Sequence, residues 1–163
     1  MGVKKERILK RDWVNFLEEF NRDNKFKATV IRLKDQALEQ EWGKPFIGIT
    51  YDPDERVAKI YLGVPQPDNP IKLVYEVKVP RAFWQIVDSE DTTKILGVQI
   101  QPKPGDPMVY VTFEDIDSEE VKRRWLQEMA YALYLKRGME HGKDQEDWFT
   151  AESIVEEAVS NFS

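Results

Sequence analysis

A helical pattern of apolar residues marks the first ordered segment of the chain. In RDWVNFLEEFNRDN, apolar side chains recur at positions i, i+3, i+4 and i+7, which lie on one face of an α-helix. These residues are Trp13, Phe16, Leu17 and Phe20. Charged residues take the opposite face, and Asn24 is typical of a helix end. The pattern predicts an amphipathic helix from about residue 10 to about residue 23.

Between residues 27 and 113 the apolar period becomes that of half-buried strands, in which every second side chain faces the core. The strand segments are KATVIRLK, PFIGITY, RVAKIYLGV, KLVYEVKV, ILGVQIQ and MVYVTF. Turn residues such as Asp52-Pro53-Asp54 and Pro104-Gly105 leave only short connections, which favours antiparallel pairing. PRAFWQI, residues 80–86, is expected to form one helical turn with Pro80 at its start.

The helical period returns after Asp117, which with Glu120 can form a capping box. Two apolar stripes follow, one in each of two segments separated by RGMEHGK. The first stripe consists of Val121, Trp125, Met129 and Leu133, and the second of Trp148, Ala151, Val155, Ala158 and Phe162. The two stripes predict a helical hairpin.

Together these patterns predict an α+β fold, in which the N-terminal helix packs on a curled antiparallel sheet of five or six strands. A C-terminal helical hairpin follows the sheet. We expect residues 1–9 to be a basic, frayed leader, residues 10–115 to be the α+β domain, and residues 116–163 to be the hairpin.

Composition excludes several kinds of chemistry. The chain of 163 residues has no cysteine, so it holds no disulfide, thiolate nucleophile or cysteine-ligated metal. No apolar run approaches the ~20 residues that span a bilayer, and the leader lacks the apolar centre of a secretory signal. We therefore expect a soluble cytoplasmic protein that does not contact membranes.

The net charge of −6 is unevenly distributed. Residues 1–113 carry 18 Lys/Arg and 17 Asp/Glu (+1), whereas residues 114–163 carry 6 and 13 (−7). An acidic total disfavours duplex nucleic acid as a partner. Single strands bind sheets on which aromatic and basic residues alternate. The candidates for such a face are Tyr61 and Tyr75, and cross-strand packing is the favoured role for both, so nucleic acid is disfavoured as a partner.

The segment RGMEHGKDQEDW, residues 137–148, holds the only histidine, His141, and four carboxylates. A zinc site would need further His or Cys ligands, and the spacing is not that of a calcium loop. Gly138 instead suits the left-handed position that ends a helix, Gly142 permits a second reversal, and Asp144 with Asp147 is an N-cap pattern. We interpret the segment as a connection between helices and predict no metal, no cofactor and no catalytic residue.

Residues 130–152 resemble the signature of a short bacterial family of unknown function that forms a helical hairpin. The shared positions are Ala130, Tyr131, Leu133, Tyr134, Arg137, Gly138, Gly142, Asp144, Asp147, Trp148, Ala151 and Glu152. Residues 11–114 more weakly resemble a second, α+β family of unknown function. The marks of that family are Trp13, Phe16, Leu17, Phe20, Leu62-Gly63, Val79, Pro80 and Trp84. Neither resemblance implies an activity, a cofactor or a site.

The apolar surface of the hairpin carries the main functional hypothesis. Apolar and aromatic side chains occupy more than one side of its first helix, and an isolated two-helix hairpin cannot leave that surface in water. We hypothesise a non-enzymatic interaction module in which the hairpin mediates self-association or binds a protein partner. The candidate interaction residues are Trp125, Met129, Tyr131, Tyr134, Leu135 and Trp148. The alternative is a small-ligand pocket, or a minor enzymatic site, between the sheet and the helices.

Overall fold

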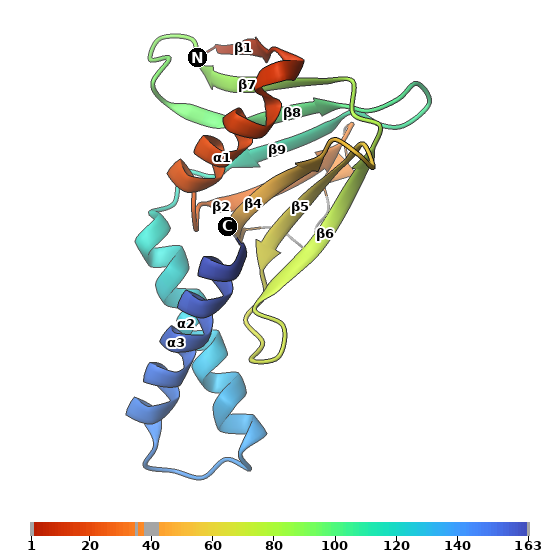
Figure 1. The fold of residues 1–163 in the computed structure, drawn as a ribbon. Coiled ribbons are helices and arrows are strands. Elements are labelled where there is room, and N and C mark those ends of the chain that lie inside the picture. The colour runs from red at the N-terminus through yellow and green to blue at the C-terminus, as the bar shows by residue number, and fades with distance from the viewer. Residues whose placement is uncertain (1, 35, 38–42, 163) are drawn as a thin grey trace.

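One antiparallel sheet and three α-helices make up the structure, a computed structural model that describes residues 2–34, 36–37 and 43–162 (Figure 1). The strands are β1 (Val3–Ile8), β2 (Ala28–Leu33), β3 (Gln36–Ala37), β4 (Lys44–Asp52), β5 (Val57–Gly63), β6 (Ile71–Lys78), β7 (Ala82–Asp88), β8 (Ile95–Gln101) and β9 (Val109–Phe113). The helices are α1 (Trp13–Asp23), which follows a 3-10 turn at Lys10–Asp12, α2 (Ser118–Lys136) and α3 (Asp144–Phe162). The predicted α+β class is confirmed.

The strands lie in the order β1-β7-β8-β9-β2-β4-β5-β6, and the short β3 pairs with the end of β2. All six predicted strands are present, as β2, β4, β5, β6, β8 and β9. The prediction of five or six strands is nevertheless too low, because β1, β3 and β7 join the same sheet.

The basic leader is an edge strand, so the expectation of a frayed terminus is wrong. Residues Val3–Ile8 pair with β7 along their whole length, from Val3 opposite Asp88 to Ile8 opposite Phe83. Lys4, Lys5 and Arg7 of β1 are exposed and charged, and only Ile8 of this strand packs against the core. An edge strand of this kind has no apolar alternation, and its order comes from backbone pairing with a distant segment.

The segment PRAFWQI is also extended and does not form the predicted helical turn. Ala82–Asp88 form β7, which is hydrogen-bonded to β1 on one side and β8 on the other. Phe83 points into the core, and Trp84, its neighbour, lies half-buried on the opposite face. Pairing on both edges outweighs the local tendency of a segment that begins with proline.

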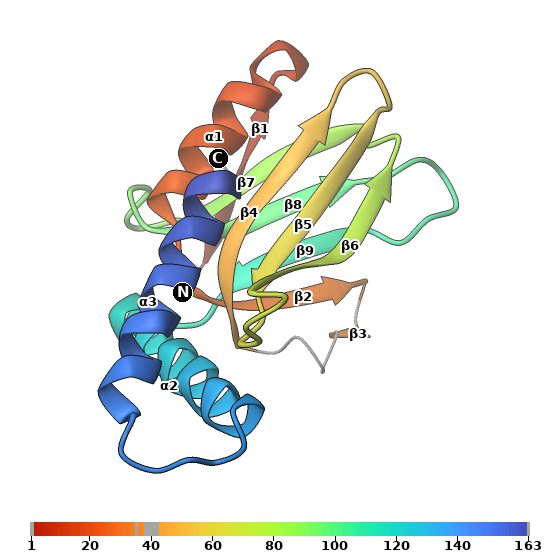
Figure 2. The same cartoon turned by 60° about the horizontal axis from the view of Figure 1, so that its bottom comes forward.

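The sheet bends between β2 and β4, which are joined only at Ala28–Pro45 and Thr29–Lys44. One half then consists of β1, β7, β8, β9 and β2, and the other of β4, β5 and β6, with the core between them (Figure 2). α1 closes one side of this core with Trp13, Leu17 and Phe20. The bend explains how one sheet supplies both walls of the core.

The hairpin of α2 and α3 packs in cis, on the outer side of the β4-β5-β6 half (Figure 1). Ile47 of β4 points away from the main core into a second apolar cluster. The other buried members of this cluster are Trp125, Leu126, Met129, Ala151 and Val155, and Tyr61 and Ile71 pack against them from the sheet. Within the described residues, no helix is long and apolar enough to cross a membrane.

Candidate functional site

The connection between α2 and α3 is a hydrogen-bonded turn. Gly138 has a φ of +82°, its N–H donates to the Leu135 carbonyl at 3.2 Å, and the Met139 N–H donates to the Tyr134 carbonyl at 3.0 Å. These bonds are those of a Schellman motif, which satisfies the free carbonyls at a helix end. Gly142 also has a positive φ, of +89°. The predicted role of both glycines as reversal positions is confirmed.

A two-point ion pair between Arg137 and Asp147 closes the connection. Arg137 Nε donates to Asp147 Oδ1 at 3.0 Å, and Nη2 donates to Oδ2 at 2.7 Å. Arg137 Nη1 also donates to the carbonyl of Glu140. The hydrogen bond from Arg137 lowers the pKa of Asp147 below its ordinary value, and the same bond raises the pKa of Arg137. The ion pair fixes the end of α2 against the start of α3.

The predicted N-cap pattern of Asp144 with Asp147 does not form, because α3 already begins at Asp144 and the Asp147 carboxylate accepts from Arg137. Asp117 does cap α2, by accepting from the Glu119 N–H at 3.0 Å. The second half of the predicted capping box does not form, because Glu120 binds Arg124 at 2.8 Å.

His141 is exposed to solvent. Its ring lies beside that of Tyr134, with 5.8 Å between the two ring centroids. Both rings line a hollow of about 350 Å³ at the tip of the hairpin. The remaining lining residues are Gln127, Ala130, Tyr131, Asp144, Asp147 and Trp148. In the described parts of the chain, no three His, Asp or Glu side chains come together as a metal site would require.

The six predicted interaction residues divide into three groups. Trp125 and Met129 are buried, with 2% and 0% of their surface exposed, against the outer side of the sheet. Tyr134 and Trp148 are half-buried around the hollow at the tip. Tyr131 and Leu135 remain 61% and 47% exposed.

Two further exposed apolar residues belong to the same region and were not predicted. Met139 in the connection is 56% exposed, and Phe149 in the second turn of α3 is 65% exposed. A sequence signal existed for Phe149, because it follows Trp148 directly. Adjacent residues on a helix point about 100° apart, so both could not face the sheet.

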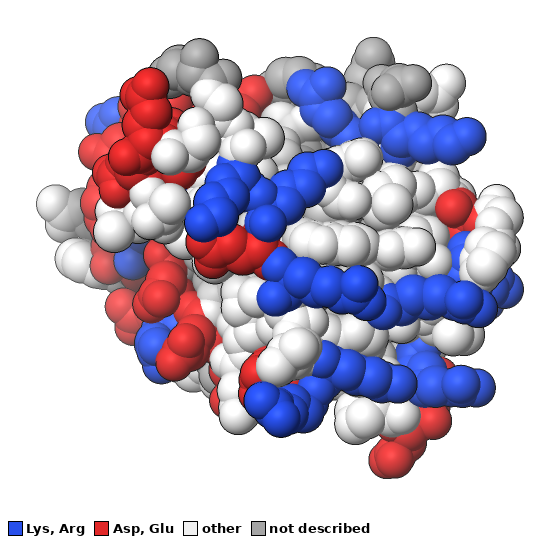
Figure 3. Space-filling model, turned by 90° about the horizontal axis from the view of Figure 1, so that it is seen from above, with Lys and Arg blue, Asp and Glu red and all other residues white. Residues whose placement is uncertain are grey.

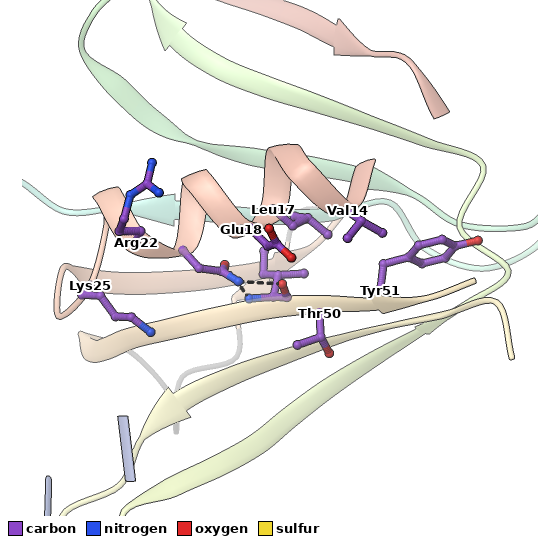
Figure 4. Close-up of a pocket in the computed structure, with 9 residues that line it drawn as sticks. Val14, Leu17, Glu18, Arg22, Lys25, Thr50 and Tyr51 are labelled. Carbon is purple, nitrogen blue, oxygen red and sulfur yellow. Dashed lines mark hydrogen bonds between the residues drawn. The ribbon is translucent and has the colours of Figure 1, made fainter. Parts of the chain in front are cut away.

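A groove of about 590 Å³ runs between α1 and the edge of β4 (Figure 4). The Asn21 side chain spans it, donating to the Ile49 carbonyl at 2.9 Å and accepting from the Ile49 N–H at 2.8 Å. This amide takes the place of a neighbouring strand where β4 extends beyond its pairing with β2. Lys25 donates to the Ile47 carbonyl at 3.1 Å, and burial lowers the pKa of Lys25.

The groove provides polar contacts without an acid–base pair. Its carboxylate, Glu18, is exposed, so it lacks the desolvation that tunes a catalytic acid. Tyr51 lines one end, and Val14 and Leu17 supply an apolar wall. This arrangement can hold a small molecule.

Comparison with known proteins identifies one family, described as a protein of unknown function (DUF2934), over residues 122–157. The matched span runs from the first turns of α2 through the connection and most of α3. It agrees with the resemblance of the hairpin segment to a family of unknown function. No curated protein and no solved structure matches the chain.

Proposed function

We propose that this protein is a non-enzymatic interaction module whose hairpin tip binds a protein partner. The observation that carries the proposal is the group of exposed apolar side chains Tyr131, Leu135, Met139 and Phe149. They lie on a hairpin whose sheet-facing side is already covered. Exposed apolar side chains concentrated in one region are typical of protein interfaces.

Packing in cis explains which residues are left for a partner. Trp125 and Met129 are covered by the chain's own sheet, so they support the hairpin and do not contact a partner. The tip of the hairpin points away from the sheet (Figure 1). The Arg137–Asp147 ion pair stiffens that tip. A rigid apolar tip loses little conformational entropy on binding, which favours association.

The charges around the tip favour a partner with basic residues over a second copy of this chain. Glu128, Glu140, Asp144 and Glu146 are exposed near the apolar residues, and residues 114–163 carry a net charge of −7 (6 Lys/Arg against 13 Asp/Glu). Two such hairpins facing each other would repel. The surface of the partner that complements this tip is therefore apolar, with a rim of Lys and Arg.

The test compares three proteins as bait in extracts of the source cells, at 100 to 300 mM salt (about 10 to 6 Å of Debye length). They are the unmodified chain, Leu135→Ser/Phe149→Ser, and the control Leu73→Ser, which changes a 39% exposed apolar residue on β6. A protein retained by the unmodified chain and the control, and lost with the double variant, is then purified for calorimetry. Equal retention by all three baits contradicts the proposal. Light scattering on the isolated protein is the second measurement, because it gives the oligomeric state. A stable dimer would show that the hairpin binds a second copy of this chain and not a different protein.

The groove between α1 and β4 supports a second candidate, the binding of a small molecule. Its volume of about 590 Å³ is within the usual range for ligand sites. A ligand there would contact Arg22, Lys25 and Tyr51, which favours an anionic group on a partly apolar body. Screening by NMR with carboxylate fragments tests this, with Val14→Trp as the variant that fills the groove.

A further inference from the structure

One row of side chains crosses the outer face of the β1-β7-β8-β9-β2 half of the sheet. The register places these residues directly opposite one another from strand to strand: Arg7, Trp84, Gln99, Tyr110 and Arg32. Directly opposed residues in an antiparallel sheet point to the same face. The row therefore has a cation at each end, an aromatic ring beside each cation, and an amide in the middle.

The face is basic although the protein as a whole is acidic. Lys5 lies two residues from Arg7 on β1, and Lys34 follows Arg32 at the end of β2. Figure 3 shows Lys and Arg side chains in parallel rows across this face, with many Asp and Glu gathered at the left of the view. Among the outward positions of these five strands, the carboxylate is Asp88, at the end of β7. Its Oδ1 accepts from the N–H groups of Glu90 and Asp91.

Both aromatic rings of the row lie beneath cations. The Arg7 guanidinium is 5.6 Å from the centre of the Trp84 ring, and Lys5 Nζ is 5.6 Å from that of Tyr110. Cation–π contacts at exposed sites are weak, about 0.5–1 kcal/mol, so a stronger stacking partner can displace them. A displaced Arg or Lys would remain next to the ring, where a phosphate of the same ligand would lie.

Gln99 supplies an observation independent of charge. It sits between the two rings with only 6% of its surface exposed, and its Oε1 accepts no hydrogen bond from any described residue. A buried acceptor without a partner is costly, and it is satisfied when a ligand brings a donor. The exocyclic amino and imino N–H groups of nucleobases are such donors.

The face is hollowed beside Tyr110. An open depression of about 600 Å³ is lined by Arg32, Lys34, Met108, Tyr110 and Thr112. It places two cations and one ring around the same space, which suits a nucleotide with its base on the ring and its phosphate toward the cations.

From these observations we infer that this sheet face binds single-stranded nucleic acid. Flat rings two strands apart on a basic sheet accept splayed bases, as sheet-based RNA-binding domains do in general. A duplex keeps its bases stacked, so it could use the cations of this face and neither ring nor Gln99. An acidic polypeptide would likewise leave the rings unused.

The negative charge of the hairpin does not prevent a single strand from binding to the sheet face. It packs on the other half of the sheet, and its tip points away from β1 and β7 (Figure 1). Charges separated by more than the Debye length of about 8 Å at physiological salt are largely screened. A single strand on this face would therefore respond mainly to the local cations.

The test is fluorescence anisotropy of the full chain with fluorescein-labelled 12-nucleotide poly(dT), poly(U) and a 12-base-pair duplex. We expect single strands to bind more tightly than the duplex. Tyr110→Ala and Trp84→Ala should each weaken single-strand binding by about tenfold or more, whereas Tyr110→Phe, which keeps the ring, should bind as the unmodified chain does. Arg7→Gln should lower the slope of log affinity against log salt by about 0.7. Gln99→Met, which keeps the shape and removes the acceptor, should weaken binding without lowering the melting temperature.

The matched control is Arg124→Gln, which removes an exposed cation from α2, outside both the sheet face and the hairpin tip. Circular dichroism verifies that each variant is folded. Three results would overturn the inference: no single-strand binding at 50 mM salt, equal affinity for the duplex, or a ring-removing variant that folds and binds like the unmodified chain. A Tyr110→Phe variant that binds as weakly as Tyr110→Ala would also overturn it, because the ring and not the hydroxyl is the proposed contact.

Discussion

Gly63 of the sheet lies directly against Trp125 of the hairpin. A Cβ atom placed on Gly63 would lie 2.9 Å from Cζ2 and Cη2 of Trp125, and 2.9 Å from Cγ of Pro45. The indole of α2 therefore rests on bare backbone at the end of β5. The absence of a side chain at Gly63 therefore allows the close packing of Trp125 on the sheet.

Gly63→Ala should destabilise the protein by about 1–3 kcal/mol, because the added methyl group overpacks a buried contact. Urea unfolding followed by circular dichroism measures the loss. The same substitution in a Trp125→Leu background should cost less, since the ring is gone and the added methyl group then meets only Pro45. An equal cost in both backgrounds would show that Gly63 acts through something other than Trp125.

Trp125→Ala should cost about 3–5 kcal/mol, the usual loss for removing a large buried aromatic side chain. Trp125→Phe should cost clearly less than the alanine variant. The indole Nε1 donates no hydrogen bond to any described residue, so phenylalanine keeps part of the packing and removes an unpaired buried donor. Denaturant midpoints of the two variants check the ranking. A phenylalanine variant as unstable as the alanine variant would indicate that the N–H has a partner.

Gly138→Ala should lower stability by about 1 kcal/mol, because a residue with a Cβ is strained at a φ of +82°. Thermal unfolding measures the change. Lys136→Ala, in the last turn of the same helix, is the control and should have little effect. The stability loss of Gly138→Asn should lie between those of Gly138→Ala and Lys136→Ala, since asparagine tolerates the left-handed region better than alanine does.

Acid should loosen the hairpin tip. The pKa of Asp147 is lower in the folded protein than its ordinary value of 3.8, so the ion pair with Arg137 adds stability above that value. The contribution is lost as the pH falls below 3.8 and through the folded pKa, where the carboxylate takes up a proton. Hydrogen exchange at residues 137–148 should accelerate across this window more than exchange in β8.

Asp147→Asn should remove that pH response and accelerate exchange of the tip at neutral pH. Glu120→Gln is the matched control, because it removes the carboxylate of an exposed pair with Arg124 on the same hairpin. The control should leave exchange of the tip unchanged. A pH response that persists in Asp147→Asn would assign it to another carboxylate.

The sequence alone determined the elements whose signals are local. The 3.6-residue period of Trp13, Leu17 and Phe20 predicted α1, and Gly138 predicted the end of α2. Alternation within single segments predicted six strands. In each case, the residues that define the element are neighbours along the chain, so their pattern is visible without the fold.

Tertiary structure decided the rest. β1 carries almost no apolar signal, and β7 was predicted as a helical turn, so their pairing appeared only when residues about 80 positions apart met along one edge. The row from Arg7 through Trp84, Gln99 and Tyr110 to Arg32 joins the consecutive strands β7, β8 and β9 to β1 and β2, which lie far from them in the chain. Register across strands creates this row, and no spacing within one segment records it. The sequence likewise predicted that the hairpin must be covered, and only the tertiary structure showed that its own sheet covers it, through Ile47, Tyr61, Ile71 and the bare backbone of Gly63.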